Sequence, residues 1–270
     1  MLYFIPTPIG NLSDVSLHVL EVLKECEVIF CEDTRVTKKL LSLLQDRYNL
    51  TLKNIQFYSL HSHNENEVLK DLDIEIFKKT SAYMSDAGMP CISDPGNSLI
   101  KFAQKNGIDY EVLSGSNALL LAAVASGLIR KEFSFLGFLP NKGDERKISI
   151  QNALNSAFPA IIYESPKRIL SLIKDIANLA PQREIFIIKE ATKKFEKKYF
   201  DTAINLAKIL EDENLNGEFC VVVDKNKNTK FETILESDIL ALDIPPKQKS
   251  KLLAKISGKN IKEIYKNLIK

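Results

Sequence analysis

Residues 85–96 read SDAGMPCISDPG, and within this stretch the quartet Ser-Asp-x-Gly occurs twice, eight residues apart. The stretch directly follows a short apolar, β-prone run at residues 81–84. Residues 94–96, Asp-Pro-Gly, are an ordinary turn signature. Residues 86–90 place a carboxylate and a glycine directly after a strand, where backbone amides are free to meet a ligand. We therefore predict a ligand loop at 86–90 and a turn at 94–96 that closes it and starts a helix.

Other short apolar runs resemble the one before this loop, and amphipathic segments separate them. Such runs suit strands that are buried on both faces. Strands are predicted at residues 2–6, 28–31, 55–59, 82–85, 110–113, 133–138, 160–163, 184–189 and 219–223. Because helices fit between them, the pattern predicts the α/β class with mostly parallel sheets.

Three helix signals carry specific expectations. Residues 117–126 are apolar almost all round, which predicts a buried helix. Asn64 and Glu67 form a capping-box pattern at the start of another helix. Ser165-Pro166 reads as an N-cap followed by proline in the first helical turn.

The chain of 270 residues is long enough for two medium domains and a tail. A boundary near residue 116 divides the predicted strands into two similar sets, so we predict α/β domains at 1–116 and 117–228. Residues 229–270 are predicted to be a helical tail, in which Ser257-Gly258 separates two short helices. Between residues 245 and 270 the tail has eight lysines and one acid, which favours contact with a polyanion.

Cysteine spacing and hydropathy indicate the cellular compartment of the protein. The four cysteines share no CxxC spacing, which fits a reducing cytosol better than a disulfide scaffold. The N-terminus has no basic region followed by an apolar run, and no stretch is long enough to span a bilayer. We therefore expect a soluble, cytoplasmic protein without a membrane segment.

Two polar loops follow predicted strands. Residues 32–35 read Glu-Asp-Thr-Arg, and a helix N-cap explains Asp33 or Thr34 but not Arg35, which is unfavourable in a first turn. His61 and His63 lie in a second loop without a clear third ligand, so a metal site is the weaker interpretation and none is predicted. A plain polar loop is the default, and a catalytic or RNA-contacting His63 is the alternative.

Several stretches, taken in order, resemble one family. They are PTPIGNLSD, CEDTRVTKKLL, HSHNE, SDAGMPCISDPG, SGSNALL, GFLP, YESPKR, EATKKFE and GEFCVVVD. Together they resemble the bacterial 16S ribosomal RNA 2′-O-cytidine methyltransferases of the tetrapyrrole methylase superfamily, over nearly the whole chain. The resemblance implies an S-adenosylmethionine-dependent homodimer with two α/β domains and the cofactor in the cleft between them. The implied substrate is the ribose 2′-hydroxyl of a decoding-centre cytidine in the small ribosomal subunit.

The family's cofactor site can be carried over onto this sequence. The implied cofactor-binding residues are Pro8, Asp86, Ala87, Gly88, Met89, Pro90, Ser114, Gly115 and Ser116. The chain departs from the family pattern at Met89, at Ser116-Asn117 and at Ala191, where the family commonly has Thr, Pro-Ser and Leu. These departures affect side-chain contacts, whereas backbone contacts would survive.

Methyl transfer to a ribose hydroxyl requires in-line placement and benefits from a base. In falling order of preference the expected bases are His63, Glu32, Asp33 and Glu164. Phosphate contacts are expected from Arg35, Lys167, Arg168, Lys247, Lys249 and Lys251. Two alternatives stay open: a sister methylase acting on a tetrapyrrole or a protein side chain, and a non-catalytic RNA-binding assembly factor.

Overall fold

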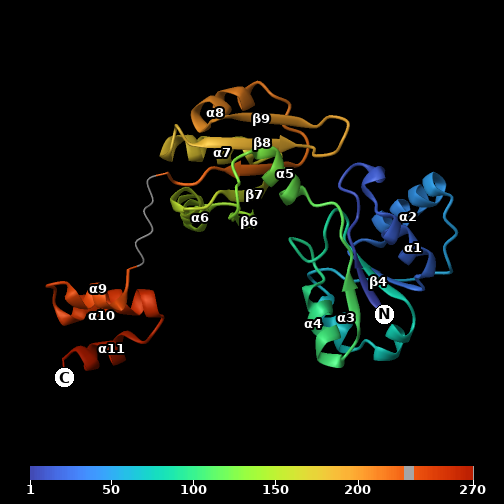
Figure 1. The fold of residues 1–270 in the computed structure, drawn as a ribbon, viewed down its shortest axis with the longest axis horizontal. Helices are drawn as coiled ribbons and strands as arrows, with labels where there is room; N and C mark the ends of the chain where they lie inside the picture. Colours follow the sequence, from blue (N-terminus) through green and yellow to red (C-terminus); the bar gives the residue numbers. More distant parts are fainter. Residues whose placement is uncertain (228–233, 270) are drawn as a thin grey trace. The chain divides into compact units, whose positions relative to one another are not determined.

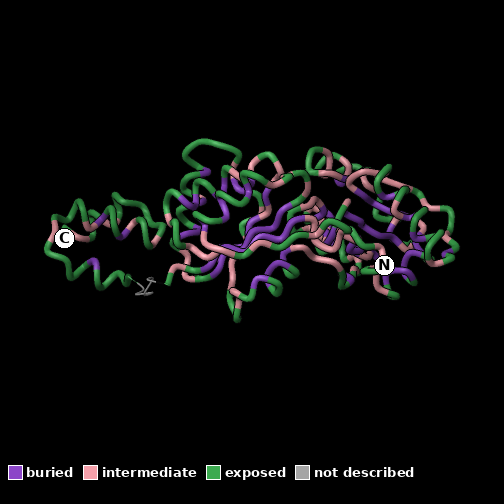
Figure 2. Tube along the Cα trace, turned by 90° about the horizontal axis from the view of Figure 1, so that it is seen from above, coloured by how far each residue is buried: buried purple, intermediate pink, exposed green. Residues whose placement is uncertain are grey.

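A computed structural model describes residues 1–227 and 234–269 of the protein. Contacts along the chain divide it into two units, Met1–Asn226 and Lys227–Lys270. The boundary predicted at 228/229 lies outside the described residues. Figure 1 shows that the first unit contains both sheets, and Figure 2 shows their strands as the most deeply buried part of the chain.

The first sheet has five parallel strands in the order β3-β2-β4-β1-β5. Its strands are β1 (Leu2–Ile5), β2 (Val28–Cys31), β3 (Gln56–Ser59), β4 (Ser81–Met84) and β5 (Tyr110–Val112). The connections contain α1 (Leu17–Glu25), α2 (Thr34–Tyr48), α3 (Glu65–Lys70), α4 (Asn97–Asn106) and the short 3-10 helices η1 (Leu12–Asp14) and η2 (Ile74–Lys78). Because β4 lies between β1 and β2, the loops that follow these three strands meet at one edge of the sheet.

Local capping explains most helix boundaries in this half. The Ser16 hydroxyl accepts from the Val19 N–H at the start of α1, and Gly107 ends α4 in the left-handed conformation. The capping box predicted at Asn64 is wrong. Asn64 precedes α3, but its side-chain oxygen accepts from the His61 N–H at 2.8 Å and so stabilises the preceding turn instead.

The second sheet has the order β6-β7-β10-β8-β9. Its strands are β6 (Ser134–Phe138), β7 (Ala160–Glu164), β8 (Glu184–Lys189), β9 (Lys197–Thr202) and β10 (Phe219–Val223). Only β6 and β7 pair in parallel, while β10 is antiparallel to both of its neighbours and β9 is antiparallel to β8. The expectation of mostly parallel sheets is therefore correct for the first sheet and wrong for the second. The sequence did not predict β9, because this edge strand is charged and largely exposed and lacks an apolar run.

Helices cover both faces of the second sheet. α6 (Gly143–Asn155), α7 (Ile169–Leu179) and α8 (Ala203–Glu211) contribute to one core, and α5 (Ala118–Ser126) packs on the other face. The prediction that α5 is buried all round is wrong, because Leu120 is 51% exposed and Val124 is 83% exposed. The predicted helix start at Ser165-Pro166 is also wrong, since α7 begins at Ile169 and these two residues form the turn before it.

The second unit contains α9 (Glu236–Ala241), α10 (Pro246–Ser257) and α11 (Ile261–Leu268). Gly258 ends α10 in the left-handed conformation, so the predicted break in the tail is confirmed. In the ranges that the structure describes, every helix is too short or too polar to cross a membrane.

Candidate active site

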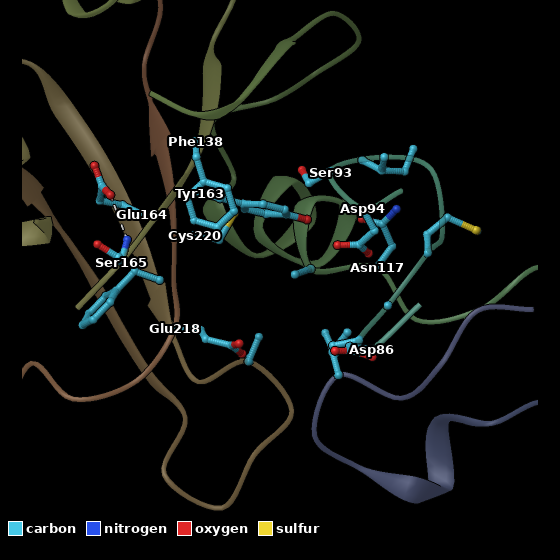
Figure 3. Close-up of a pocket in the computed structure, with 18 of the residues that line it drawn as sticks. Asp86, Ser93, Asp94, Asn117, Phe138, Tyr163, Glu164, Ser165, Glu218 and Cys220 are labelled. Carbon is cyan, nitrogen blue, oxygen red and sulfur yellow. Dashed lines mark hydrogen bonds between the residues drawn. The ribbon is translucent and has the colours of Figure 1, made fainter. Parts of the chain in front are cut away.

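A cleft of about 450 Å³ lies where the loops of the first sheet face the ends of β6, β7, β8 and β10. Its size falls within the range of small-molecule sites, about 300–1,000 Å³. Figure 3 shows acidic side chains from both halves at the cleft, and the aromatic side chains Phe138 and Tyr163 from the second sheet. The residues that line it include Ile9, Glu32, Asp86, Ala87, Gly88, Met89, Ser93, Asp94, Asn117, Phe138, Tyr163, Glu164 and Ile188.

Gly88 connects the loop after β4 to the loop after β1. Its N–H donates to the Thr7 carbonyl at 3.0 Å, and its carbonyl accepts from the Thr7 N–H at 2.9 Å and from the Ser85 hydroxyl at 3.1 Å. Gly88 has φ +87°, and a Cβ built there would lie 3.1 Å from Cγ2 of Ile9. The expectation of free amides in this loop is therefore wrong at Gly88, whose N–H is already bonded. A side chain at position 88 would fill the space next to Ile9 in the cleft wall.

Three carboxyl groups from the first half line the same cleft. Burial raises the pKa of Asp86, Asp94 and Glu32. Repulsion by Asp86 adds to this effect for Asp94 and Glu32, and repulsion by Asp33 adds to it for Asp86. For Asp94 the pKa rises to about 6. The Asp86 carboxylate accepts from the Asp33 N–H at 3.2 Å, which joins the loops after β2 and β4.

Tyr163, near the end of β7, defines the opposite wall. Its ring makes edge contacts with Phe135 and Phe138, at centroid distances of 4.9 and 5.7 Å. Its hydroxyl accepts from the Leu119 N–H at 3.1 Å, and burial raises its pKa. In Figure 3 this hydroxyl points towards Asp94. Tyr163 therefore remains protonated and has a hydroxyl hydrogen to donate into the cleft.

Glu164 lies beside the cleft, but its carboxylate is already held. The side chain has no exposed surface and pairs with Arg146 at 3.2 Å and with Arg168 at 2.7 Å. Its other interaction is with the Ser165 N–H at 2.8 Å. This arrangement gives the buried carboxylate two arginine partners and fixes the turn between β7 and α7.

Comparison with known proteins identifies the family. The family model for Tetrapyrrole (Corrin/Porphyrin) Methylases matches residues 1–207. The chain belongs to the tetrapyrrole methylase family. Among its relatives, the Ribosomal RNA small subunit methyltransferase I of Campylobacter fetus subsp. fetus is 62% identical over 270 residues, 100% of both chains. That of Helicobacter pylori strain J99 is 42% identical and covers 98% of this chain and 96% of its own. The chain therefore also belongs to the methyltransferase I family and is a methyltransferase.

Solved structures share the fold of this methylase. A uroporphyrin-III C-methyltransferase from Thermus thermophilus, complexed with S-adenosylhomocysteine, matches with a TM-score of 0.53 and 15% identity. The match covers 82% of this chain and 96% of that one. At this identity the likeness establishes the two-sheet fold of the methylase, which was the fold predicted from the sequence.

The methylase brings only part of the predicted cofactor set to the cleft. Asp86, Ala87, Gly88 and Met89 line it, whereas Pro8, Pro90, Ser114, Gly115 and Ser116 do not. Their neighbours Ile9, Asn117 and Ala118 line it instead. Packing explains the glycine at position 115, because a Cβ there would clash with the ring of Pro6.

The four predicted bases lie in four different settings. Glu32 lines the cleft, and Glu164 is held by its two arginines. Asp33 points at Arg35, whose guanidinium donates to both of its oxygens and lowers its pKa to about 2. His63 is exposed in the turn before α3, outside the cleft lining, and its N–H donates to Nδ1 of His61.

The predicted phosphate-binding residues are also scattered. Arg35 has an 89% exposed side chain, and Lys167 is exposed beside the cleft. Arg168 is engaged by Glu164, Ser165, Leu139 and Asn141, so its guanidinium has structural partners. Lys247 and Lys251 are exposed on α10, and Lys249 donates to the Leu240 carbonyl at 2.7 Å.

Sequence reasoning missed the wall of the cleft that contains Asp94, Phe138 and Tyr163. The sequence indicates an ordinary turn at Asp94 and only a strand position for Tyr163 and Phe138. The duplicated Ser-Asp-x-Gly quartet was the available signal for Asp94. Nothing local distinguished Tyr163, because its role depends on helix α5 and on the loop 85–96 packing opposite β7. Within residues 1–227 and 234–269, no three His, Cys, Asp or Glu side chains come together as a metal site.

Proposed function

We propose that this methyltransferase transfers a methyl group from S-adenosylmethionine to the ribose 2′-hydroxyl of a decoding-centre cytidine in 16S ribosomal RNA. The observation that carries the proposal is the full-length similarity, at 62% identity, to a protein named Ribosomal RNA small subunit methyltransferase I. The methyl acceptor is then the small-subunit RNA, and the finer assignment to a cytidine ribose rests on the sequence resemblance. On the same basis we propose a cytoplasmic homodimer.

The cleft fits the proposed cofactor. Its carboxylates could accept from ribose hydroxyls or face an ammonium group, and Ile9, Met89 and Ile188 supply an apolar wall. The absence of a Cβ at Gly88 leaves room beside Ile9. Asp86, Gly88, Met89 and Asn117 would hold the cofactor, which supplies an electrophilic methyl group when bound. Met89 lacks the hydroxyl of the family's usual threonine, so contacts at this position would come from the backbone and the thioether.

The chain's own residues would then orient the acceptor and exclude water from it. The carboxyl groups are partly buried, so they would face a positioned hydroxyl in a partly desolvated site. Arg35 and Lys167 are exposed and would contact phosphates on the rim, and of the four expected bases Glu32 is the one that lines the cleft without an ion pair among the described residues. Arg168 would act indirectly by stabilising the β7–α7 turn.

The decisive experiment is methyl transfer to unmodified small subunits. Purified protein and radiolabelled S-adenosylmethionine are incubated with subunits from a strain that lacks this modification, and the labelled nucleoside is identified by mass spectrometry. We expect 2′-O-methylcytidine, with no incorporation into already modified subunits and none with Asp86→Ala. If the protein binds S-adenosylmethionine in calorimetry but labels no RNA, the RNA assignment is wrong and a sister substrate or a binding role replaces it.

A second prediction concerns the basic tail. Replacing three lysines of α10 by glutamine should weaken RNA binding uniformly and lower the slope of log affinity against log salt by about 2, since each phosphate contact contributes about 0.7. The variant is Lys247→Gln, Lys249→Gln and Lys251→Gln, and its matched control is Lys101→Gln, Lys105→Gln and Lys208→Gln, all exposed in the first unit. Filter binding across salt concentrations measures both, and circular dichroism checks helix content. Equal slopes in the two variants would exclude the tail as a phosphate contact.

A further inference from the structure

Asp94 lines the cleft but lies outside the predicted cofactor loop at residues 86–90. It belongs to the second Ser-Asp-x-Gly quartet and lines the cleft together with Ser93. Figure 3 shows its carboxylate beside Asn117 and opposite the Tyr163 hydroxyl. This carboxylate therefore lies where it could take part in the reaction as well as shape a turn.

The backbone around Asp94 holds it in place. Gly96 has φ +115°, and a Cβ there would lie 2.8 Å from the ring of Tyr83, so this turn is pressed against the core. The Asn97 side-chain amide donates to the Cys91 carbonyl at 3.0 Å, which closes the loop. The carboxylate therefore projects from a rigid support, as a catalytic group requires.

The two ends of the loop 85–96 approach different sheets. Asp86 is bonded to the backbone of Asp33 and so faces the first sheet. Ser93, by contrast, has its hydroxyl 3.9 Å from the place where a Cβ on Gly137 of β6 would be, so this end of the loop approaches the second sheet. Asp94 is thus displaced from the Asp86–Met89 segment towards the wall formed by Tyr163.

The other acids are less suited to take a proton in the cleft. Asp33 is held by Arg35, and Glu164 is held by Arg146 and Arg168, so both carboxylates already have ion-pair partners. Glu32 also lines the cleft, but it follows β2 next to Asp33, whose N–H bonds Asp86, and so belongs to the cofactor end of the cleft. By contrast, no ion pair to Asp94 is found among the described residues. We propose that Asp94 is the general base that accepts the proton of the ribose hydroxyl, an inference that rests on the proposed methyl transfer.

The electrostatic surroundings agree with this role. The groups that face Asp94 are Ser85, Asp86, Glu32, Tyr83, Cys91 and Tyr163. None of them is a cation, while burial and Asp86 raise the pKa of Asp94 to about 6. Asp94 is then ionised at neutral pH and basic enough to receive a proton, which is the range that suits a general base.

The proton and electron balance is simple. The hydroxyl O–H bond breaks and its proton moves to a carboxylate oxygen of Asp94. The hydroxyl oxygen forms the new bond to the methyl carbon, and the electron pair of the broken carbon–sulfur bond stays on the donor's sulfur. Proton release from Asp94 to solvent restores the carboxylate for the next turnover.

The test compares Asp94→Asn with wild type and with Asp109→Asn, an exposed aspartate outside the cleft. We expect Asp94→Asn to lower kcat on unmodified subunits by about 10²- to 10⁴-fold. Its calorimetric Kd for S-adenosylmethionine should stay within about threefold of wild type, because the residue acts on the acceptor. Asp109→Asn should match wild type in both measurements.

The pH profile gives a readout that a structural role would not produce. Wild-type kcat should fall below pH of about 6, because protonated Asp94 cannot accept a proton, and residual Asp94→Asn activity should lack this limb. Loss of S-adenosylmethionine binding in Asp94→Asn would make it a cofactor ligand and overturn the proposal. So would loss of the acidic limb in Glu32→Gln instead, or a wild-type profile without this limb. If wild-type protein labels no RNA, the proposed function itself is wrong. This outcome is therefore distinct from a failure of the Asp94 proposal.

Discussion

Replacing Gly88 by valine is expected to abolish measurable S-adenosylmethionine binding. The residue has φ +87°, which a β-branched side chain adopts only with strain of about 1–3 kcal/mol. Its Cβ would lie 3.1 Å from Cγ2 of Ile9, and the two further methyl groups would press on a cleft wall. Relief of this strain would disrupt the Thr7–Gly88 bridge that joins the loops after β1 and β4. Calorimetry should show a Kd raised by at least about 100-fold, which corresponds to about 2.7 kcal/mol.

The matched control is Gly107→Val. Gly107 also has a positive φ, +66°, but it ends α4 outside the cleft and a Cβ there meets nothing within 4 Å. Both variants carry backbone strain, so both should lower thermal stability, while only Gly88→Val should change cofactor affinity. An unchanged Kd in Gly88→Val, measured on folded protein, would show that the cofactor does not use this loop.

Replacing Glu164 by alanine is expected to cause the largest loss of stability. Its side chain has no exposed surface, and the change would leave Arg146, which is 8% exposed, without its buried carboxylate. Arg168 would lose the same partner. Breaking a buried pair by removing one member costs about 3–5 kcal/mol, because an uncompensated charge stays behind. Urea unfolding of the full chain, followed by circular dichroism, measures this loss.

An exposed ion pair provides the comparison. Glu25 pairs with Lys53 at 2.7 Å, but both side chains are largely exposed, at 67% and 45%. Glu25→Ala should therefore cost less than about 1 kcal/mol. If Glu164→Ala is equally mild, then water or a rearranged carboxylate reaches the arginines, and the structural role assigned to Glu164 is wrong.

The sequence predicted the strands well where burial is two-sided. The runs at β2 and β10 are apolar throughout, and β8 is apolar between its terminal Glu184 and Lys189; each forms a strand with the predicted bounds. It failed at β9, whose charged residues pair along an edge and carry no apolar signal. It also failed to give strand direction in the second sheet, because direction depends on which strands the chain places next to one another.

Helix α5 shows a different limit. Its composition predicts burial on every side, yet Val124 is 83% exposed, since only one face packs on the second sheet. Hydrophobicity reports that a surface prefers to leave water, and the fold decides whether a partner surface is available. For Glu164 the sequence showed an acid after a strand, but not the two arginines that bind it.

The stretch 85–96 shows which features the sequence determined and which the tertiary structure decided. Local chemistry determined that a loop with two acids and two glycines follows β4, and the family resemblance made Asp86–Met89 the expected cofactor segment. Tertiary packing decided that Thr7 takes the Gly88 N–H, that Asp33 holds Asp86, and that Asp94 faces Tyr163. The reason is physical: the pKa and orientation of a carboxylate depend on burial and on charges brought from distant parts of the chain, which spacing along the sequence does not record.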